Sequence, residues 1–406
     1  MPLVDFCCNS RRIPPTAETA CGSLGPHLSR CVRSFHQSFS EYAPTPLVRL
    51  RVLARLWGLG GISVKDESLR FGLDAFKVLG CAWATARCIA SRLGISADAL
   101  TVEAVFSEEV RSRLGNITLV TATDGNHGRA LAWTAQKLGL NAVVFMPRGA
   151  APSRQEKIRE TGAVCTETDQ NYDDTVSFAA RYAAATNGIL IQDTAWDGYE
   201  EIPQWIMEGY TTLADEADEQ ICHFSPEPPS HVFLQAGVGS FAAAILAWYV
   251  MRWKDKAPLC ILVEPAKADC IFRSIKMADG LSHSVAGNLE TIMAGLSCGK
   301  PSTLGWKILQ HHVDVALSCD DSIAASGMRI LAAPRPGDPV VTGGESGAVT
   351  AGALEYIMRS PHLACLRSSL KLGPDAHVLL INTEGATDPE QYEKIVWHGL
   401  YPQAAE

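Results

Sequence analysis

SVKDESLRFGLDAFKVLG, residues 63–80, is the stretch around which the chain is organised. It predicts a short strand, a charged turn, an irregular loop and then Lys77 at the start of an apolar helix that continues to about residue 93. Burial among apolar neighbours disfavours an ammonium ion, so we expect a lowered pKa for Lys77 and a nucleophilic amine able to form a Schiff base. For one lysine alone, a side chain that snorkels from an ordinary helix is the commoner explanation.

The composition is that of a globular chain of 406 residues, 47% hydrophobic and 19% charged. A single core rarely grows past roughly 250–300 residues, so this length predicts two domains. The net charge of −9 argues against nucleic acid or an anionic membrane as a partner. No apolar run is long enough to span a bilayer. A small-molecule enzyme in the cytoplasm is therefore expected.

The 13 cysteines lie largely in apolar segments and predict reduced core thiols. No CxxC pair and no Cys/His spacing typical of zinc occurs, so no metal site is predicted. A regulatory disulfide between Cys270 and Cys298 is a minority alternative. Residues 1–33 predict a poorly defined segment and are compatible with a transit peptide.

Strands and helices alternate from residue 116 onward. The first series has expected strands at 117–122, 142–146, 164–167 and 189–192, with helices between them. A second series with longer helices has strands at 231–235, 259–264 and 378–382. Continuous apolar strands between helices are typical of parallel sheets covered on both faces.

The expected fold is therefore α/β, with two open, mostly parallel sheets that carry helices on both faces. The smaller domain, residues 85–199, would be inserted in a larger domain made of residues 34–84 and 200–406. Ligands bind such sheets in the cleft beyond the carboxyl ends of the strands.

QAGVGS, residues 235–240, joins an expected strand to an apolar helix. Glycines let the backbone approach a ligand closely, and exposed N–H groups at a helix start bind phosphate. The segment lacks the third glycine of the dinucleotide fingerprint and the lysine of the P-loop. Tight packing of strand against helix is an equally good explanation of this segment alone.

TDGNHG, residues 123–128, also follows a buried strand. Asp124 could act as a base or hold a cation, and Asn126 could donate to a phenolate oxygen. A turn that only caps the next helix is the alternative, and for His127 we expect local packing or hydrogen bonding. Asp193 ends a third strand, and GGESG (343–347) and NTEG (382–385) are similar loops. Together with Lys77 these loops form one constellation.

A set of ordered motifs runs between residues 34 and 390. The motifs are YAPTPL (42–47), VKDES (64–68), RFGLDAFK (70–77), TDGNHG (123–128), QDTAWDGY (192–199), QAGVGSFA (235–242), VEPAKADC (263–270), TIMAGLSCG (291–299) and GGESG (343–347). They resemble those of the fold type II pyridoxal-phosphate (PLP) enzymes, the class of threonine dehydratase, serine racemase and tryptophan synthase β. Within that class they are most similar to the diaminopropionate ammonia-lyases. One departure is Asp74, where the pattern has Asn, which would place a negative charge near the cofactor.

The resemblance implies pyridoxal 5′-phosphate as the cofactor and assigns its contacts. Lys77 would hold it as a Schiff base, Asn126 would contact its 3′-oxygen, and Thr383 would hydrogen-bond the pyridine nitrogen near Glu345. The phosphate would be bound by Gly237, Val238, Gly239 and Ser240. Enzymes of this class are commonly dimers, so a homodimer is expected by analogy.

The expected reaction is α,β-elimination of 2,3-diaminopropionate to pyruvate and two ammonia. Lys77 would remove the Cα proton on one face, and Asp124 on the other if the D-isomer is accepted. Asp124 and Asp193 would receive the β-ammonium group, because a hydroxyl substrate would not justify two carboxylates in a dehydrated cleft. A serine or threonine dehydratase is one alternative. A catalytically silent relative is another, against which the intact Lys77 and Asn126 argue.

Overall fold

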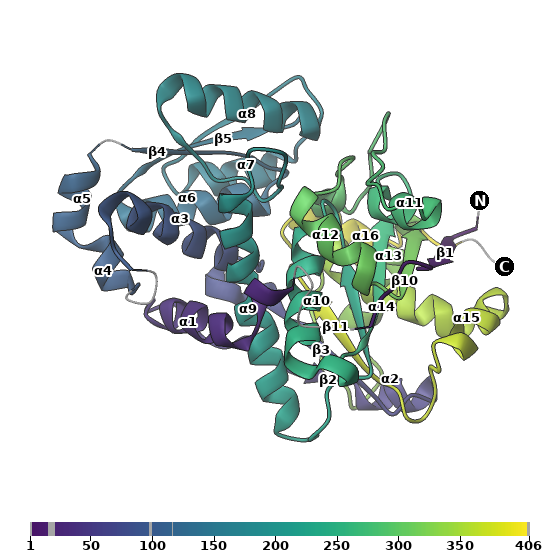
Figure 1. Ribbon diagram of the computed structural model, residues 1–406. Coiled ribbons are helices and arrows are strands. Elements are labelled where there is room, and N and C mark those ends of the chain that lie inside the picture. Colours follow the sequence, from purple (N-terminus) through teal and green to yellow (C-terminus); the bar gives the residue numbers. More distant parts are fainter. Residues whose placement is uncertain (1, 15–20, 97–99, 116, 404–406) are drawn as a thin grey trace.

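The computed structural model describes residues 2–14, 21–96, 100–115 and 117–403, and arranges them in two helix-covered sheets (Figure 1). The larger sheet has seven strands in the order β1-β10-β9-β8-β11-β3-β2. Its inner pairs are parallel, and only β1 and β2, at the two edges, run antiparallel to their neighbours. The strands are β1 (Val4–Cys8), β2 (Leu47–Arg49), β3 (Gly61–Asp66), β8 (His231–Gln235), β9 (Leu259–Pro265), β10 (Val315–Cys319) and β11 (His377–Asn382).

The larger sheet is buried on both faces, which is why its strands are continuously apolar. In β8, Val232 and Leu234 pack in one hydrophobic cluster with α9 (Glu201–Cys222) and α10 (Ser240–Trp253). Phe233, between them, points the other way, into a cluster with α13 (Asp321–Ala332) and α14 (Glu345–Arg359). Successive side chains of a strand point to opposite faces of the sheet, so alternate residues of β8 pack against two separate helix layers.

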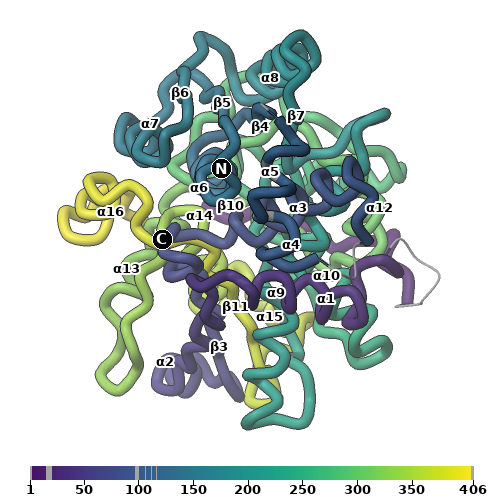
Figure 2. Tube along the Cα trace, turned by 90° about the vertical axis from the view of Figure 1, so that its left-hand side faces the viewer, coloured from purple at the N-terminus to yellow at the C-terminus, as the bar shows by residue number. Residues whose placement is uncertain are grey.

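The smaller sheet is wholly parallel, in the order β6-β5-β4-β7. Its strands are β4 (Thr118–Ala122), β5 (Asn141–Met146), β6 (Val164–Glu167) and β7 (Ile189–Leu190), and its helices are α6 (Asn126–Leu138), α7 (Pro152–Arg159) and α8 (Tyr172–Thr186). In Figures 1 and 2 these elements form a unit of their own above the larger sheet. The predicted α/β class with two mostly parallel sheets is confirmed. The domain boundaries stay a prediction, because α3 (Val78–Leu93) spans the boundary at residue 84 and packs on both α6 and α9.

The amino-terminal residues contribute more than the sequence indicated. Within the segment 1–33, β1 pairs with β10, and α1 (Pro26–Gln37) begins and packs on α9. β10 itself was not predicted. The remaining helices are α2 (Arg51–Leu56), α4 (Val102–Phe106), α5 (Glu108–Leu114), α11 (Cys270–Met277), α12 (Thr303–His312), α15 (Ala364–Ser369), α16 (Pro389–Val396) and the short 3₁₀ turns η1 (Gly22–Leu24), η2 (Glu67–Gly72), η4 (Lys254–Lys256), η5 (Ala294–Leu296) and η6 (Pro361–Leu363). No helix in the described part of the chain is both long and apolar enough to cross a bilayer.

A buried ion network fixes the stretch 63–80 in space. Glu216 of α9 accepts from Lys65 and Arg70 at 2.7 Å each, and Glu67 pairs with Arg70 at 2.7 Å. All four side chains are fully buried, so each charge needs its partner. Beyond the network, the amide of Phe76 donates to the Thr383 carbonyl at 3.2 Å, which brings the start of α3 to the end of β11.

Candidate active site

A cavity lies at the carboxyl ends of both sheets, and nearly all the predicted site residues line it. The structure brings together Lys77, Asp124, Asn126, Asp193, Gly237, Val238, Gly239, Ser240 and Thr383. Glu345 is the exception: it is 2% exposed and lies behind the wall, where Ser346 and Glu384 face the cavity instead.

Lys77 forms an ion pair with Asp193 across the cavity. Burial by itself lowers the pKa of Lys77, but the Asp193 carboxylate outweighs burial and raises the pKa above its usual value. The prediction of a lowered pKa was therefore wrong, because the sequence did not show which carboxylate would face the amine. Burial would raise the pKa of Asp193, but the Lys77 ammonium group outweighs burial and lowers the pKa to about 2.

Asp124 follows β4 and lies in the same cavity. Burial raises its pKa to about 6, against the opposing charges of Arg154 and Lys77. Its carboxylate is thus close to the proton affinity that a general base needs near neutral pH. The two carboxylates differ for a physical reason: Asp193 contacts the ammonium group directly and Asp124 does not.

Asn126 donates its side-chain amide to Glu384, the residue after Thr383. The other oxygen of Glu384 accepts from the backbone of Ser346 at 3.0 Å. This contact joins the smaller sheet to the larger one. Glu384 was expected in a polar loop at a strand end, without a role of its own.

His127 makes local contacts, as expected. Its Nε2 lies 2.8 Å from the Ile191 carbonyl, and its Nδ1 lies 3.3 Å from the sulfur of Cys81. The same Nδ1 is 3.8 Å from Asp193, and burial lowers the pKa of His127. A neutral imidazole therefore supports the wall of the cavity behind Asp193.

The segment 235–240 has the geometry of an anion cradle. Gly239 has φ +93°, a conformation that favours glycine, and a Cβ there would lie 2.5 Å from Cδ1 of Ile271. The first turn of α10 follows directly, and N–H groups at a helix start lack acceptors within the helix. Ser240 fixes the loop by donating to the Asp193 carbonyl at 2.7 Å. This arrangement fits a phosphate.

Thr383 is oriented by a neighbour. Its oxygen accepts from Nε2 of Gln235 at 2.8 Å, which leaves its own hydrogen free to be donated. A hydroxyl donor of this kind suits an unprotonated ring nitrogen. A lysine, a phosphate cradle and a neutral donor therefore surround one cavity, and these residues fit PLP.

Asp74 does not add an uncompensated charge to the cavity. Its carboxylate pairs with Arg129 at 2.8 Å and lies 3.7 Å from Lys157. Asp74 has φ +59°, a left-handed conformation that Asp and Asn adopt more readily than most residues. The backbone therefore accepts either residue, and two cations of the smaller sheet's helices neutralise the aspartate.

Cys270 and Cys298 are free thiols in the structure, as are the other cysteines, so the alternative of a disulfide between them finds no support. Cys298 lines the cavity. Several other lining residues were given no role from the sequence. Phe76, Gln235, Ser346 and Glu384 lie in the quoted motifs and loops, whereas Tyr172 of α8 and Tyr210 of α9 lie outside them.

Comparison with known proteins agrees with this geometry. The family model described as pyridoxal-phosphate-dependent enzyme matches residues 39–384. A diaminopropionate ammonia-lyase of Salmonella typhimurium strain LT2 is 46% identical over 98% of both chains, and one of Escherichia coli strain K12 is 46% identical over 93% of both. The chain belongs to the diaminopropionate ammonia-lyase family of PLP-dependent enzymes.

A solved structure of this family shares the fold over almost the whole chain. The Escherichia coli diaminopropionate ammonia-lyase in complex with an aminoacrylate-PLP azomethine reaction intermediate aligns with a TM-score of 0.90 and 44% identity, and covers 99% of this chain and 98% of its own. The predicted family, PLP dependence and ammonia-lyase class are thereby confirmed.

Proposed function

We propose that the chain converts 2,3-diaminopropionate and water to pyruvate and two molecules of ammonia. The observation that carries this proposal is the facing set of Lys77, Asp124 and Asp193 in one buried cavity beside a phosphate cradle. The near-full-length relatives with this activity in their names support it.

Each site residue has a proposed task. Lys77 would hold PLP covalently through its amine, residues 237–240 would bind the phosphate, Asn126 the 3′-oxygen and Thr383 the ring nitrogen. Asn126 now donates to Glu384, so we propose that this contact yields to the cofactor's oxygen. Glu345 would act from behind the wall, where burial and Glu384 raise its pKa to about 7.

PLP supplies the electron sink that makes the Cα proton acidic. The protein supplies bases on two sides of the cavity. Lys77, released from the cofactor when substrate binds, would take the proton of the L-isomer. Asp124 would take that of the D-isomer, and its pKa of about 6 leaves it ionised at neutral pH.

Asp193 already shows how the site would hold a β-ammonium group. It is buried, ionised and paired with an ammonium group, that of Lys77. An incoming β-ammonium would offer the same charge at the same carboxylate. A hydroxyl group would leave the buried anion without a counter-charge, which is costly.

The remaining assignments are also proposals. The separate sheet of β4, β5, β6 and β7 supports a smaller domain, residues 85–199, inserted in the larger one. The free thiols support a reducing compartment such as the cytoplasm. A homodimer is proposed by analogy with the fold class alone.

The test compares four substrates, L- and D-2,3-diaminopropionate, serine and threonine, with pyruvate or 2-oxobutyrate and ammonia both measured. We expect turnover of diaminopropionate with two ammonia per pyruvate. Lys77→Ala should lose activity with both isomers, whereas Asp124→Asn should lose the D-isomer selectively. Lys307→Ala, an exposed lysine paired with Glu200, is the matched control and should keep full activity.

Three results would contradict the proposal. A clear preference for serine or threonine would indicate a dehydratase. The absence of a visible absorbance band with added PLP would indicate a silent relative. Full turnover by Lys77→Ala would remove the lysine from the mechanism.

A further inference from the structure

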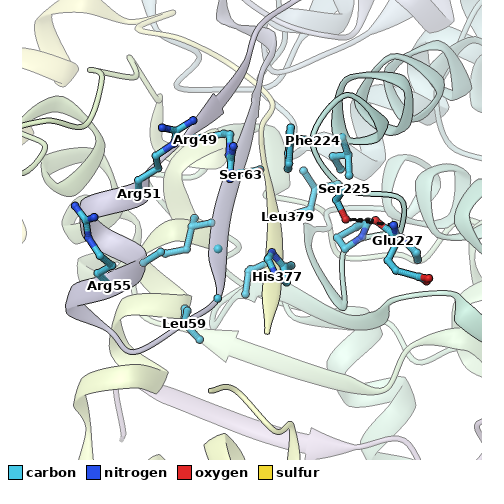
Figure 3. A pocket seen from close by; sticks show the side chains of 18 residues that line it. Arg49, Arg51, Arg55, Leu59, Ser63, Phe224, Ser225, Glu227, His377 and Leu379 are labelled. Atoms are coloured by element: carbon cyan, nitrogen blue, oxygen red, sulfur yellow. Dashed lines mark hydrogen bonds between the residues drawn. The ribbon is translucent and has the colours of Figure 1, made fainter. Parts of the chain in front are cut away.

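A second cavity lies at the opposite end of the larger sheet, at the amino ends of β3 and β11. Its volume is about 190 Å³. Figure 3 shows that Arg49, Arg51 and Arg55 line one side, the segment from Phe224 to Glu227 lines the other, and His377 lies between them. A six-residue strand separates this cavity from the active site by roughly 20 Å. It is therefore distinct from the catalytic centre.

The lining includes three arginines, of which Arg49 is partly buried and Arg51 and Arg55 are exposed to solvent. Among the residues that the structure describes, Arg49, Arg51 and Arg55 form no ion pair and no side-chain hydrogen bond. Arg51 and Arg55 are one turn apart on α2, so like charges share one face, which is unfavourable. The nearby carboxylate of Asp338 is engaged elsewhere, by the amides of Val52 and Leu53 at 2.8 Å each.

Arg49 shows the uncompensated charge most directly. Its guanidinium carbon lies 4.1 Å from the centroid of the Phe224 ring, which holds the side chain over the cavity wall. Burial and then the charge of Arg51 lower the pKa of Arg49. A negative group placed here would offset the repulsion between Arg49 and Arg51.

The single acid of the lining does not neutralise the arginines. Both carboxylate oxygens of Glu227 accept from Lys256 at 2.9 Å, so Glu227 is already paired. In a chain whose net charge is −9, this cavity is a local concentration of positive charge. Concave surfaces of one sign concentrate ions of the opposite sign.

Two further polar groups lie in the cavity, the His377 ring and the Ser63 hydroxyl. The His377 ring lies against the backbone of β3, where a Cβ on Gly61 would come within 2.9 Å of Nδ1. Within the described residues neither the His377 ring nor the Ser63 hydroxyl has a hydrogen-bond partner. The cavity thus offers many hydrogen-bond donors, and its described residues include no unpaired carboxylate that could accept from them. Its floor is apolar, formed by Leu59, Ile62 and Leu379.

We propose that this cavity binds a small dianionic metabolite, a phosphate monoester or a dicarboxylate. A single carboxylate has two oxygens and can pair with one guanidinium group. A phosphate, or a ligand with a second carboxylate, has enough oxygens and charge to pair with more than one arginine. The apolar floor would take the carbon skeleton of the ligand. A Cβ at position 61 would require the His377 imidazole to shift.

Calorimetric titration of the PLP-loaded enzyme tests the site, because the cofactor then fills the phosphate cradle at residues 237–240. The probes are inorganic phosphate, succinate and, as a monoanion, acetate, all at matched ionic strength. We expect saturable binding of phosphate or succinate and none of acetate. Arg49→Gln, Arg51→Gln and Arg55→Gln should each weaken binding by roughly tenfold. Arg92→Gln, an exposed arginine at the end of α3, is the matched control and should change nothing.

The pattern of binding identifies the ligand's chemistry. Binding of phosphate alone indicates a phosphate monoester, and binding of succinate alone indicates a dicarboxylate. Two results overturn the proposal: equal binding of acetate, or affinities for the dianions that are the same in the wild type and in Arg49→Gln and Arg51→Gln. Retention of the PLP absorbance band in each variant shows that it is folded, so a loss of binding is then local.

Discussion

At the scale of single residues, the site depends on giving two nearby carboxylates different proton affinities. Asp193 contacts the Lys77 ammonium group and its pKa is held at about 2. Asp124 is buried without such contact, and its pKa is raised to about 6. One group is thereby suited to holding a cation, and the other to accepting a proton.

The raised pKa of Asp124 predicts a pH dependence for the D-isomer alone. A base must be ionised to act, so kcat/KM for D-2,3-diaminopropionate should fall about tenfold per pH unit below roughly pH 6. The L-isomer, whose proton goes to Lys77, should not show this step. Parallel pH profiles of the two isomers check this prediction. The same acid limb in both profiles would mean that Asp124 is not the base specific to the D-isomer.

The chemical types at this site were predictable from the sequence, but their pairings were not. Lys77, Asp124, Asn126 and Asp193 were found because each follows a buried strand or begins an apolar helix. The pairing of Lys77 with Asp193 was not predictable, because the residues are far apart in the chain and several acids could have faced the amine. The expected direction of the Lys77 pKa was wrong for that reason.

At the scale of elements, glycines set the distances between strands, helices and ligands. Gly80 of α3 and Gly209 of α9 lie where the two helices touch, and a Cβ on Gly209 would lie 2.4 Å from the Leu79 carbonyl oxygen. This close approach seats α3, and with it Lys77, against the larger sheet's helices. Periodicity predicted both helices, but it could not predict how closely they pack.

Gly239 allows a matched test of the phosphate cradle. Gly239→Ala would strain a backbone at φ +93° and place a methyl group 2.5 Å from Ile271, so the loop must shift. We expect PLP affinity to fall at least about tenfold, with roughly 1–3 kcal/mol lost from the free energy of unfolding. Spectroscopic PLP titration and urea denaturation measure these two effects.

Gly162→Ala is the control for this substitution. Gly162 has φ +86°, but open space surrounds the position of its Cβ, so strain is introduced without a clash and away from the cavity. This variant should lose similar stability and keep its PLP affinity. Equal PLP affinities in the two variants would show that Gly239 does not shape the cofactor site.

At the scale of the whole molecule, the sequence predicted the two parallel sheets because short, mostly apolar strands alternate regularly with helices. It missed the edge of the larger sheet. β1 is only partly buried, so it lacks the apolar run of a central strand. β10 is fully buried and five residues long, like the central strand β8, and it was missed although its burial pattern is the same. The pairing of β1 with β10 joins residues 4–8 to 315–319, a long-range contact that no local pattern reports.

β1 gives a test of that edge. Deleting residues 2–9 would leave the backbone groups of β10 without partners and expose a sheet edge, which promotes aggregation. Val4 is 4% exposed, and Phe6 packs on the same hydrophobic cluster, so their loss should lower the free energy of unfolding by roughly 3–5 kcal/mol. β1 contributes no residue to the catalytic cavity. We therefore expect kcat/KM per folded PLP-loaded molecule to stay within about twofold of the wild type.

Urea denaturation, light scattering and steady-state kinetics separate these effects, and Asp5→Asn is the control within the same strand. It removes only an exposed ion pair with Lys276 and should cost less than about 1 kcal/mol. If the truncated chain kept wild-type stability, β1 would contribute nothing to the stability of the larger sheet. If it lost kcat/KM while still folded and loaded with PLP, the edge would be coupled to the catalytic cavity at the carboxyl ends of the neighbouring strands. We expect lower stability with unchanged catalysis, because the edge strand contributes burial and hydrogen bonds whereas the residues of the catalytic cavity follow the central strands.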